Sequence, residues 1–124
     1  MSPRAPLGTE ALPATASRLL SLPTAPLAAA GMIAGYGVAA GTGSRPLGGV
    51  VLGAFGVSCI AIWLGRDGRA VAAKLGLTGL VMFALSHLLG LAIGAWPAVL
   101  VSAGVLAAAC ERLSDAPLRA RRRA

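Results

Sequence analysis

Three side chains within the apolar stretches of this chain could bind a ligand or carry a proton: Tyr36, Ser86 and His87. His87 carries the one group there that titrates near neutral pH, and an ionisable side chain in an apolar segment indicates a functional site by default. Tyr36 and His87 each lie ten residues before a proline, Pro46 and Pro97 respectively. We therefore expect both rings at equal depth, forming one polar layer with Ser86 that points into the protein. The alternative is a structural histidine that hydrogen-bonds to a backbone carbonyl.

The other reactive residue types do not form a pattern that indicates catalysis. The four acidic residues lie in the terminal segments, in a loop or at a helix end: Glu10, Asp67, Glu111 and Asp115. Proton-coupled exporters of this size exchange protons on a carboxylate within the membrane, and intramembrane proteases need a Ser–His pair or paired aspartates. Cys59 and Cys110 lack the clustered histidines of a metal site, so we expect them to be buried as small hydrophobic residues. The sequence predicts no enzyme, no cofactor and no metal.

Long uncharged runs define the elements that must position these residues. The chain is 56 % hydrophobic and 12 % charged over 124 residues, which is too apolar for a soluble domain of this size. A bilayer span needs roughly 20 residues at about 1.5 Å rise each. Residues 19–44 and 46–65 can hold one span apiece, and residues 75–110 hold two because Pro97 interrupts them. We predict an all-α membrane protein with four transmembrane helices, paired as two hairpins, at residues 24–43, 46–65, 71–93 and 97–113.

The segments outside the predicted transmembrane domain differ in character. Residues 1–23 contain four prolines and should be mostly disordered, apart from a short interfacial turn near residues 15–22. Residues 114–124 should form a basic tail. A cleavable signal peptide is the alternative for the first span, because small residues at 38–40 follow an apolar stretch.

The distribution of basic residues predicts the orientation. With four spans, ten of the eleven lysines and arginines fall on one side, and Arg45 stands alone on the other. Basic residues near span ends are retained on the cytoplasmic face, so both termini should be cytoplasmic in a cell (inner) membrane. The net charge of +7 does not indicate nucleic-acid binding, because no aromatic residues are interleaved with the charges. Four arginines of the tail could instead bind anionic lipid headgroups: Arg119, Arg121, Arg122 and Arg123.

Small residues at a spacing of four recur along the predicted spans and indicate helix packing. Helices in lipid associate through close backbone contact over such residues. The glycine pairs that we expect at helix contacts are Gly31 and Gly35, Gly49 and Gly53, and Gly90 and Gly94. Their number exceeds the contacts within a four-helix bundle, which favours a homo-oligomer or a larger membrane partner. An alternative explanation is a composition rich in glycine and alanine.

The two halves of the chain can also be aligned with each other. An offset of 51 residues pairs Pro46 with Pro97, Gly53 with Gly104 and Cys59 with Cys110. Each half is then one helical hairpin. This pattern predicts a possible parallel internal repeat about an axis along the membrane normal.

The stretches at residues 45–49, 86–90 and 93–100 resemble small, uncharacterised four-span integral membrane proteins of high-GC actinobacteria. The resemblance extends over residues 45–110. It implies the membrane class and brings no assigned activity.

These observations predict a multi-pass membrane protein without catalysis. The first interpretation is an interaction or accessory subunit that packs through its small-residue helix faces against itself or a larger partner. The alternative is a minimal oligomeric transporter or channel with a polar layer around His87. A His87 that is sealed by side chains would favour the first interpretation, and a cavity that reaches His87 would favour the second.

Overall fold

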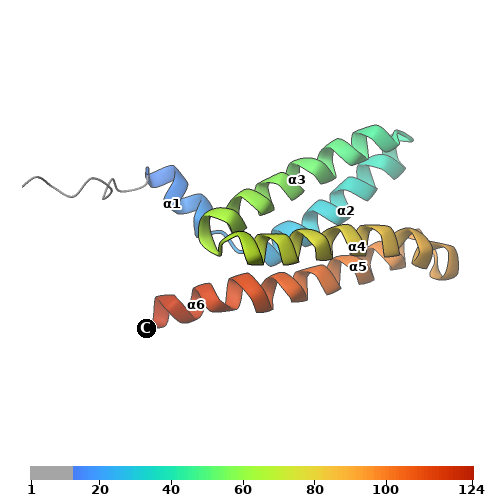
Figure 1. Ribbon diagram of the computed structural model, residues 1–124. Helices are drawn as coiled ribbons and strands as arrows, with labels where there is room; N and C mark the ends of the chain where they lie inside the picture. Colours follow the sequence, from blue (N-terminus) through green and yellow to red (C-terminus); the bar gives the residue numbers. More distant parts are fainter. Residues whose placement is uncertain (1–12) are drawn as a thin grey trace, which may run out of the picture.

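The computed structural model describes residues 13–124, which form an all-α fold (Figure 1). Four helices are long and apolar enough to cross a membrane, as the sequence predicted. The helices are α1 (Ala14–Leu20), α2 (Thr24–Thr42), α3 (Arg45–Arg66), α4 (Arg69–Ile93), α5 (Ala95–Cys110) and α6 (Ala116–Arg123), with a π-helical segment, η1 (Glu111–Asp115), between the last two. Of the segment expected to be mostly disordered, residues 1–23, the part at residues 1–12 lies outside the described residues. Helix α1 occupies most of the short turn expected near residues 15–22.

Glycines in the left-handed region make the turns between the long helices. Gly43 has φ +70°, and Gly68 and Gly94 have φ +90°, a conformation that costs other residues energy. After Gly43, the Ser44 hydroxyl accepts a hydrogen bond from the Leu47 amide and caps α3. The short turns make α2–α3 and α4–α5 antiparallel hairpins, in agreement with the expected pairing.

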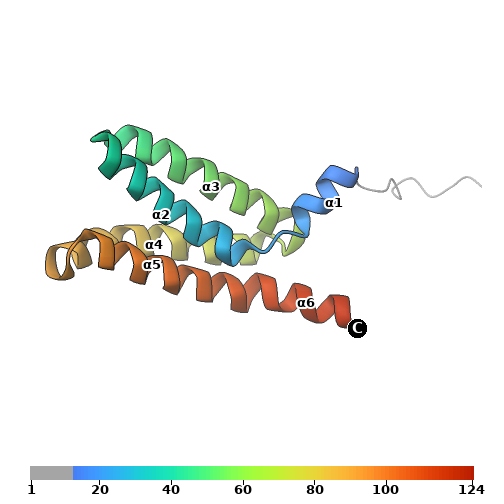
Figure 2. The same ribbon diagram turned by 180° about the vertical axis from the view of Figure 1, so that it is seen from behind.

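The two hairpins are joined mainly through α2 and α5. Helix α2 packs closely on both α3 and α5, whereas α3 and α4 make few contacts with each other. Figures 1 and 2 show the hairpins converging beside α1 and diverging toward the Gly43 and Gly94 turns. We refer to the converging end as the Arg66 end and to the diverging end as the Arg45 end, after the charged residue of α3 at each.

The hydrophobic core lies toward the Arg66 end. Its largest buried side chains include Met32, Trp63, Leu75 and Leu106, and both free cysteines, Cys59 and Cys110, belong to it. Large apolar side chains elsewhere on the long helices are exposed, and Leu91 is 87 % exposed. Such a surface matches lipid and not water, because a soluble protein rarely exposes large contiguous apolar patches.

The C-terminal segment differs from the predicted basic tail because the fourth long helix does not end near residue 113. Helix α5 passes through η1 into α6 and continues to Arg123. Pro117 cannot donate a backbone hydrogen bond, and its ring would clash with the carbonyl four residues before it in a regular helix. The wider π-helical turn accommodates the proline and lets the helix continue.

Candidate functional site

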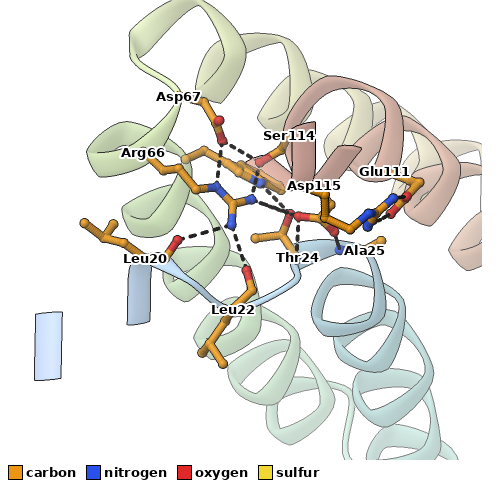
Figure 3. Close-up of polar contacts among 11 residues, drawn as sticks. Leu20, Leu22, Thr24, Ala25, Arg66, Asp67, Glu111, Ser114 and Asp115 are labelled. Carbon is orange, nitrogen blue, oxygen red and sulfur yellow. Dashed lines mark hydrogen bonds and ion pairs between the residues drawn. The ribbon is translucent and has the colours of Figure 1, made fainter. Parts of the chain in front are cut away.

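A buried polar cluster joins the helix ends at the Arg66 end (Figure 3). It consists of Thr24, Trp63, Arg66, Asp67, Ser114 and Asp115. The side chains of Arg66, Asp67 and Asp115 are only 4 %, 3 % and 2 % exposed.

Arg66 stands at the centre of this cluster. Its Nη2 donates to Asp115 Oδ1 at 2.8 Å and also contacts the Ser114 hydroxyl, while its Nε donates to Asp67 Oδ2 at 3.2 Å. Its Nη1 donates to the backbone carbonyls of Leu22 at 2.8 Å and Leu20 at 3.3 Å. The guanidinium therefore holds the α1–α2 linker, the α3–α4 turn and η1 together. A buried charge is tolerated only when it is paired and hydrogen-bonded in this way.

Asp115 caps a helix that has no cap of its own. Pro23 precedes α2 and offers no side-chain acceptor. The amides of Thr24 and Ala25 donate instead to Asp115 Oδ1 and Oδ2, at 2.9 and 2.7 Å. The Thr24 hydroxyl also donates to Asp115 Oδ1, and the Trp63 indole N–H donates to that hydroxyl at 3.0 Å. A carboxylate at a helix N-terminus satisfies free amides and interacts favourably with the helix dipole.

The sequence analysis missed this cluster because it used the basic residues for topology and lipid binding and did not consider a buried ion pair. Two signals were present. Helix α2 begins after a proline without a polar cap of its own, and both Asp67 and Asp115 were predicted at the same membrane face as Arg66. Neither signal alone selects the pairing, since it depends on how η1 turns Asp115 toward α2.

A cavity with a mainly apolar lining lies between the hairpins at the Arg45 end, and we call it the polar cavity after its four polar side chains. Its volume is about 560 Å³, and its polar lining residues are Tyr36, Arg45, Ser86 and His87. Tyr36 on α2 and Ser86 and His87 on α4 line this one cavity, and Arg45 joins them from the start of α3. Ser86 is buried and Tyr36 is partly buried, whereas His87, which was expected to point into the protein, is exposed. Within residues 13–124, no acidic side chain lines the cavity and Arg45 is its one formally charged residue.

The Tyr36 and His87 rings, which line the cavity, each pack against one aromatic side chain. Tyr36 packs edge-on against Trp96, with ring centroids 4.9 Å apart, and His87 packs against Phe83 at 4.8 Å. His87 Nδ1 lies 2.9 Å from the Phe83 carbonyl oxygen, and the Ser86 hydroxyl donates to the same oxygen at 2.7 Å. When Nδ1 donates there, Nε2 of the neutral ring is the free acceptor. The polar side chains of the cavity can therefore hydrogen-bond a ligand, and the Arg45 guanidinium can bind an anionic group.

An apolar groove between α3 and α4 continues from this cavity. Its volume is about 410 Å³, and it shares Met32, Leu52 and Phe83 with the cavity. Trp63 and Leu106 line the groove toward the Arg66 end. Glycines form much of its walls: Gly49, Gly53 and Gly56 on α3, and Gly76 and Gly79 on α4.

The structure separates the glycines that were expected at helix contacts into distinct groups. A Cβ on Gly31 would lie 2.6 Å from Phe55 Cβ, and one on Gly35 would lie 2.9 Å from Leu52 Cβ, so both lie at the tight α2–α3 contact. A Cβ on Gly49 or Gly53 would meet nothing within 4 Å. These two glycines face the apolar groove, and no helix of the described chain packs on them.

The last expected pair belongs to the α4–α5 hairpin. A Cβ on Gly90 would lie 3.7 Å from Ala95 Cα, which is ordinary contact. Gly94 makes the turn, with its φ of +90°.

The arginines expected to bind lipid headgroups lie on α6, and one of them has a protein partner. Arg119 forms an ion pair with Glu111 of η1. Arg121, Arg122 and Arg123 are exposed at the end of α6. Across residues 13–124, no group of three or more His, Cys, Asp or Glu side chains could hold a metal ion.

No family model matches this chain, and neither a curated protein nor a solved structure is significantly similar to it. The functional argument therefore depends on the residues and their geometry.

Proposed function

We propose that this chain is a non-catalytic multi-pass membrane protein that binds a small solute in the polar cavity, as the subunit of a minimal oligomeric transporter or channel. The observation that carries the proposal is the position of Tyr36, Ser86 and His87 on one cavity of about 560 Å³, together with Arg45. Ligand sites commonly have volumes of about 300–1,000 Å³ with a few polar groups in an apolar lining. A histidine enclosed by side chains would have favoured a purely structural role.

The difference between the two ends of the bundle supports a binding site that a solute enters from one side of the membrane. The buried polar cluster closes the Arg66 end, and the cavity lies where the hairpins diverge. We place the Arg45 end outside the cell and both termini in the cytoplasm of a cell (inner) membrane, because ten basic residues then lie inside and only Arg45 lies outside. In this orientation the cavity takes its solute from the outer side.

An accessory or interaction subunit is the second candidate. The open faces of Gly49 and Gly53 favour it, because a helix of a partner or of a second copy could approach them closely. If a helix covered these faces in the assembled protein, it would also restrict access to the cavity. Accessibility of His87 to water therefore distinguishes the two candidates.

Cysteine labelling in intact cells tests the proposal. In a background with Cys59→Ala and Cys110→Ala, we expect His87→Cys to react with a membrane-impermeant thiol reagent added outside. Leu88→Cys is the matched control, because Leu88 is 65 % exposed in the described chain but does not line the cavity, so lipid should protect it. Ala70→Cys, exposed at the other end, should react only after the cells are permeabilised.

Protection of His87→Cys from the outside and after permeabilisation would contradict the solute site and favour the accessory role. Labelling of Ala70→Cys in intact cells would reverse the proposed orientation.

A further inference from the structure

We propose that the apolar groove holds the acyl chain of a single-chain anionic lipid whose carboxylate lies at Arg45. The inference names the solute class for the polar cavity and therefore rests on the proposed function.

The first step is the shape of the combined site. The polar cavity and the apolar groove adjoin, and they share Met32, Leu52 and Phe83. One end of the joined site has hydrogen-bonding groups and a cation, and the remainder is walled by glycines and apolar side chains. A ligand that matches both parts has one polar head and one apolar body.

The second step is the charge. Of the residues that the structure describes, Arg45 is the only formally charged one on the lining of either hollow, so the matching head is an anion. Arg45 is also the first residue of α3, where the helix dipole adds positive potential. A guanidinium binds a carboxylate through two parallel hydrogen bonds. The head can remain at the membrane surface, because Arg45 lies at a helix end and not at mid-membrane depth.

The third step is the size of the groove. From Gly49 to Trp63 it runs about 21 Å along α3, at about 1.5 Å per residue. The groove has a volume of about 410 Å³ along that length. This long, narrow shape suits one extended hydrocarbon chain.

The fourth step is the route of entry. Helices α3 and α4 make few contacts with each other, so the groove opens sideways toward the bilayer. A lipid of the leaflet at the Arg45 end can slide its chain between them without moving its charged head across the membrane. When the acyl chain binds in the groove, contacts with apolar side chains replace its contacts with other lipid chains. Specificity must therefore come from the head group and from the fit of the acyl chain to the glycine walls.

Fluorescence quenching of the purified full-length protein in nanodiscs tests this assignment. Trp96→Phe leaves Trp63 as the only tryptophan, and Trp63 is 3 % exposed, so lipids around the protein should quench it weakly. The probes are two fatty acids, one brominated near its methyl end and one brominated near its carboxylate. With the carboxylate at Arg45, the first probe should quench Trp63 strongly and the second weakly.

Variants separate the two parts of the site. Gly53→Leu should fill the groove and abolish quenching without unfolding the protein, because a side chain there meets no neighbour. Gly104→Leu is the matched control, since it also has open space but lines neither hollow. Arg45→Gln should weaken binding of the acid by roughly tenfold, the effect of one lost charge-assisted hydrogen bond. Binding of the corresponding fatty alcohol should be unchanged.

Two results would overturn the inference. One is equal quenching by both brominated probes, and the other is quenching that Gly53→Leu and Gly104→Leu reduce to the same extent, which indicates nonspecific lipid. If either occurs while His87→Cys still labels from outside, the lipid assignment fails and the solute site stands. If His87→Cys does not label, the proposed function itself fails.

Discussion

The two ends of this bundle use polar residues in opposite ways. At the Arg66 end, Arg66 and Asp115 are buried, paired and further bonded to backbone groups. At the Arg45 end, Ser86 and His87 bond only to a carbonyl of their own helix and line a cavity. Polar groups that bond across helices fix the structure, whereas those that bond within one helix remain available to a ligand. This difference predicts that the first end supplies stability and that the second end is free for the proposed solute site.

The largest expected effect is the loss of the buried pair. Asp115→Ala would leave Arg66 buried without its main partner and would uncap α2, so the free energy of unfolding should fall by about 3–5 kcal/mol. Unfolding in detergent with increasing SDS measures this change. Glu111→Gln removes the exposed pair with Arg119 as a control and should cost less than about 1 kcal/mol.

A triple variant guards this prediction against a protein that does not fold. Arg66→Met combined with Asp67→Asn and Asp115→Leu removes all three buried charges and should recover part of the lost stability, because buried ion pairs are often replaceable by apolar residues. Equal stability of Asp115→Ala and the wild type would show that the polar cluster does not hold the ends together.

Adjacent glycines provide the next test of the comparison. A Cβ on Gly48 would lie against the Gly35 carbonyl oxygen and 2.6 Å from Ala39 Cβ, while one on Gly49 would meet nothing within 4 Å. Gly48→Ala should therefore lower the free energy of unfolding by about 1–3 kcal/mol through overpacking. Gly49→Ala should leave it unchanged. The same SDS titration measures both, and equal effects would contradict the close α2–α3 contact.

The native cysteines report on closure of the Arg66 end. Cys59 and Cys110 are buried in the core there, so a thiol reagent added to the folded protein in detergent should react slowly. Asp115→Asn keeps the size of the side chain but removes its charge, and it should accelerate the reaction by opening this end. If the rates are equal in both proteins, the cysteines are protected by packing alone.

The smallest effect is expected on α6. Arg122→Gln should weaken binding to vesicles with anionic lipids by about 1 kcal/mol, as expected for one basic residue near such a surface. Arg119→Gln combined with Glu111→Gln should have less effect, because the pair that it removes has no net charge. Comparing vesicles with and without anionic lipid measures the difference. Equal losses would show that Arg119 binds the anionic surface in spite of Glu111.

The long helices were predictable because their signal is repeated over many residues. The lengths of the uncharged runs and the break near Pro97 placed all four, and the observed ends differ from the predicted ones by a few residues, except at the last helix. There the charges of Glu111 and Arg112 suggested an end to the helix. The structure instead continues through η1, because the polar side chains at this position bond within the protein.

The candidate sites were predictable only in part. The distances of Tyr36 and His87 from the prolines predicted an equal depth for the two rings, and both side chains line one cavity. Arg45 was recognised for topology but not for the cavity. The buried polar cluster depends on contacts between Thr24 and Asp115, 91 residues apart, and no local pattern encodes such a pairing. The glycine spacing likewise did not distinguish Gly48, which is in close contact, from Gly49, which is not.

The cap on α2 imposes an order on the assembly of the protein during synthesis. Thr24 and Ala25 are made early, yet their acceptor, Asp115, emerges about 90 residues later. Until then, the start of the first long helix has free amides that only water or lipid headgroups can satisfy. The first hairpin therefore forms with the start of α2 uncapped, and η1, which is synthesised after the fourth long helix, completes it.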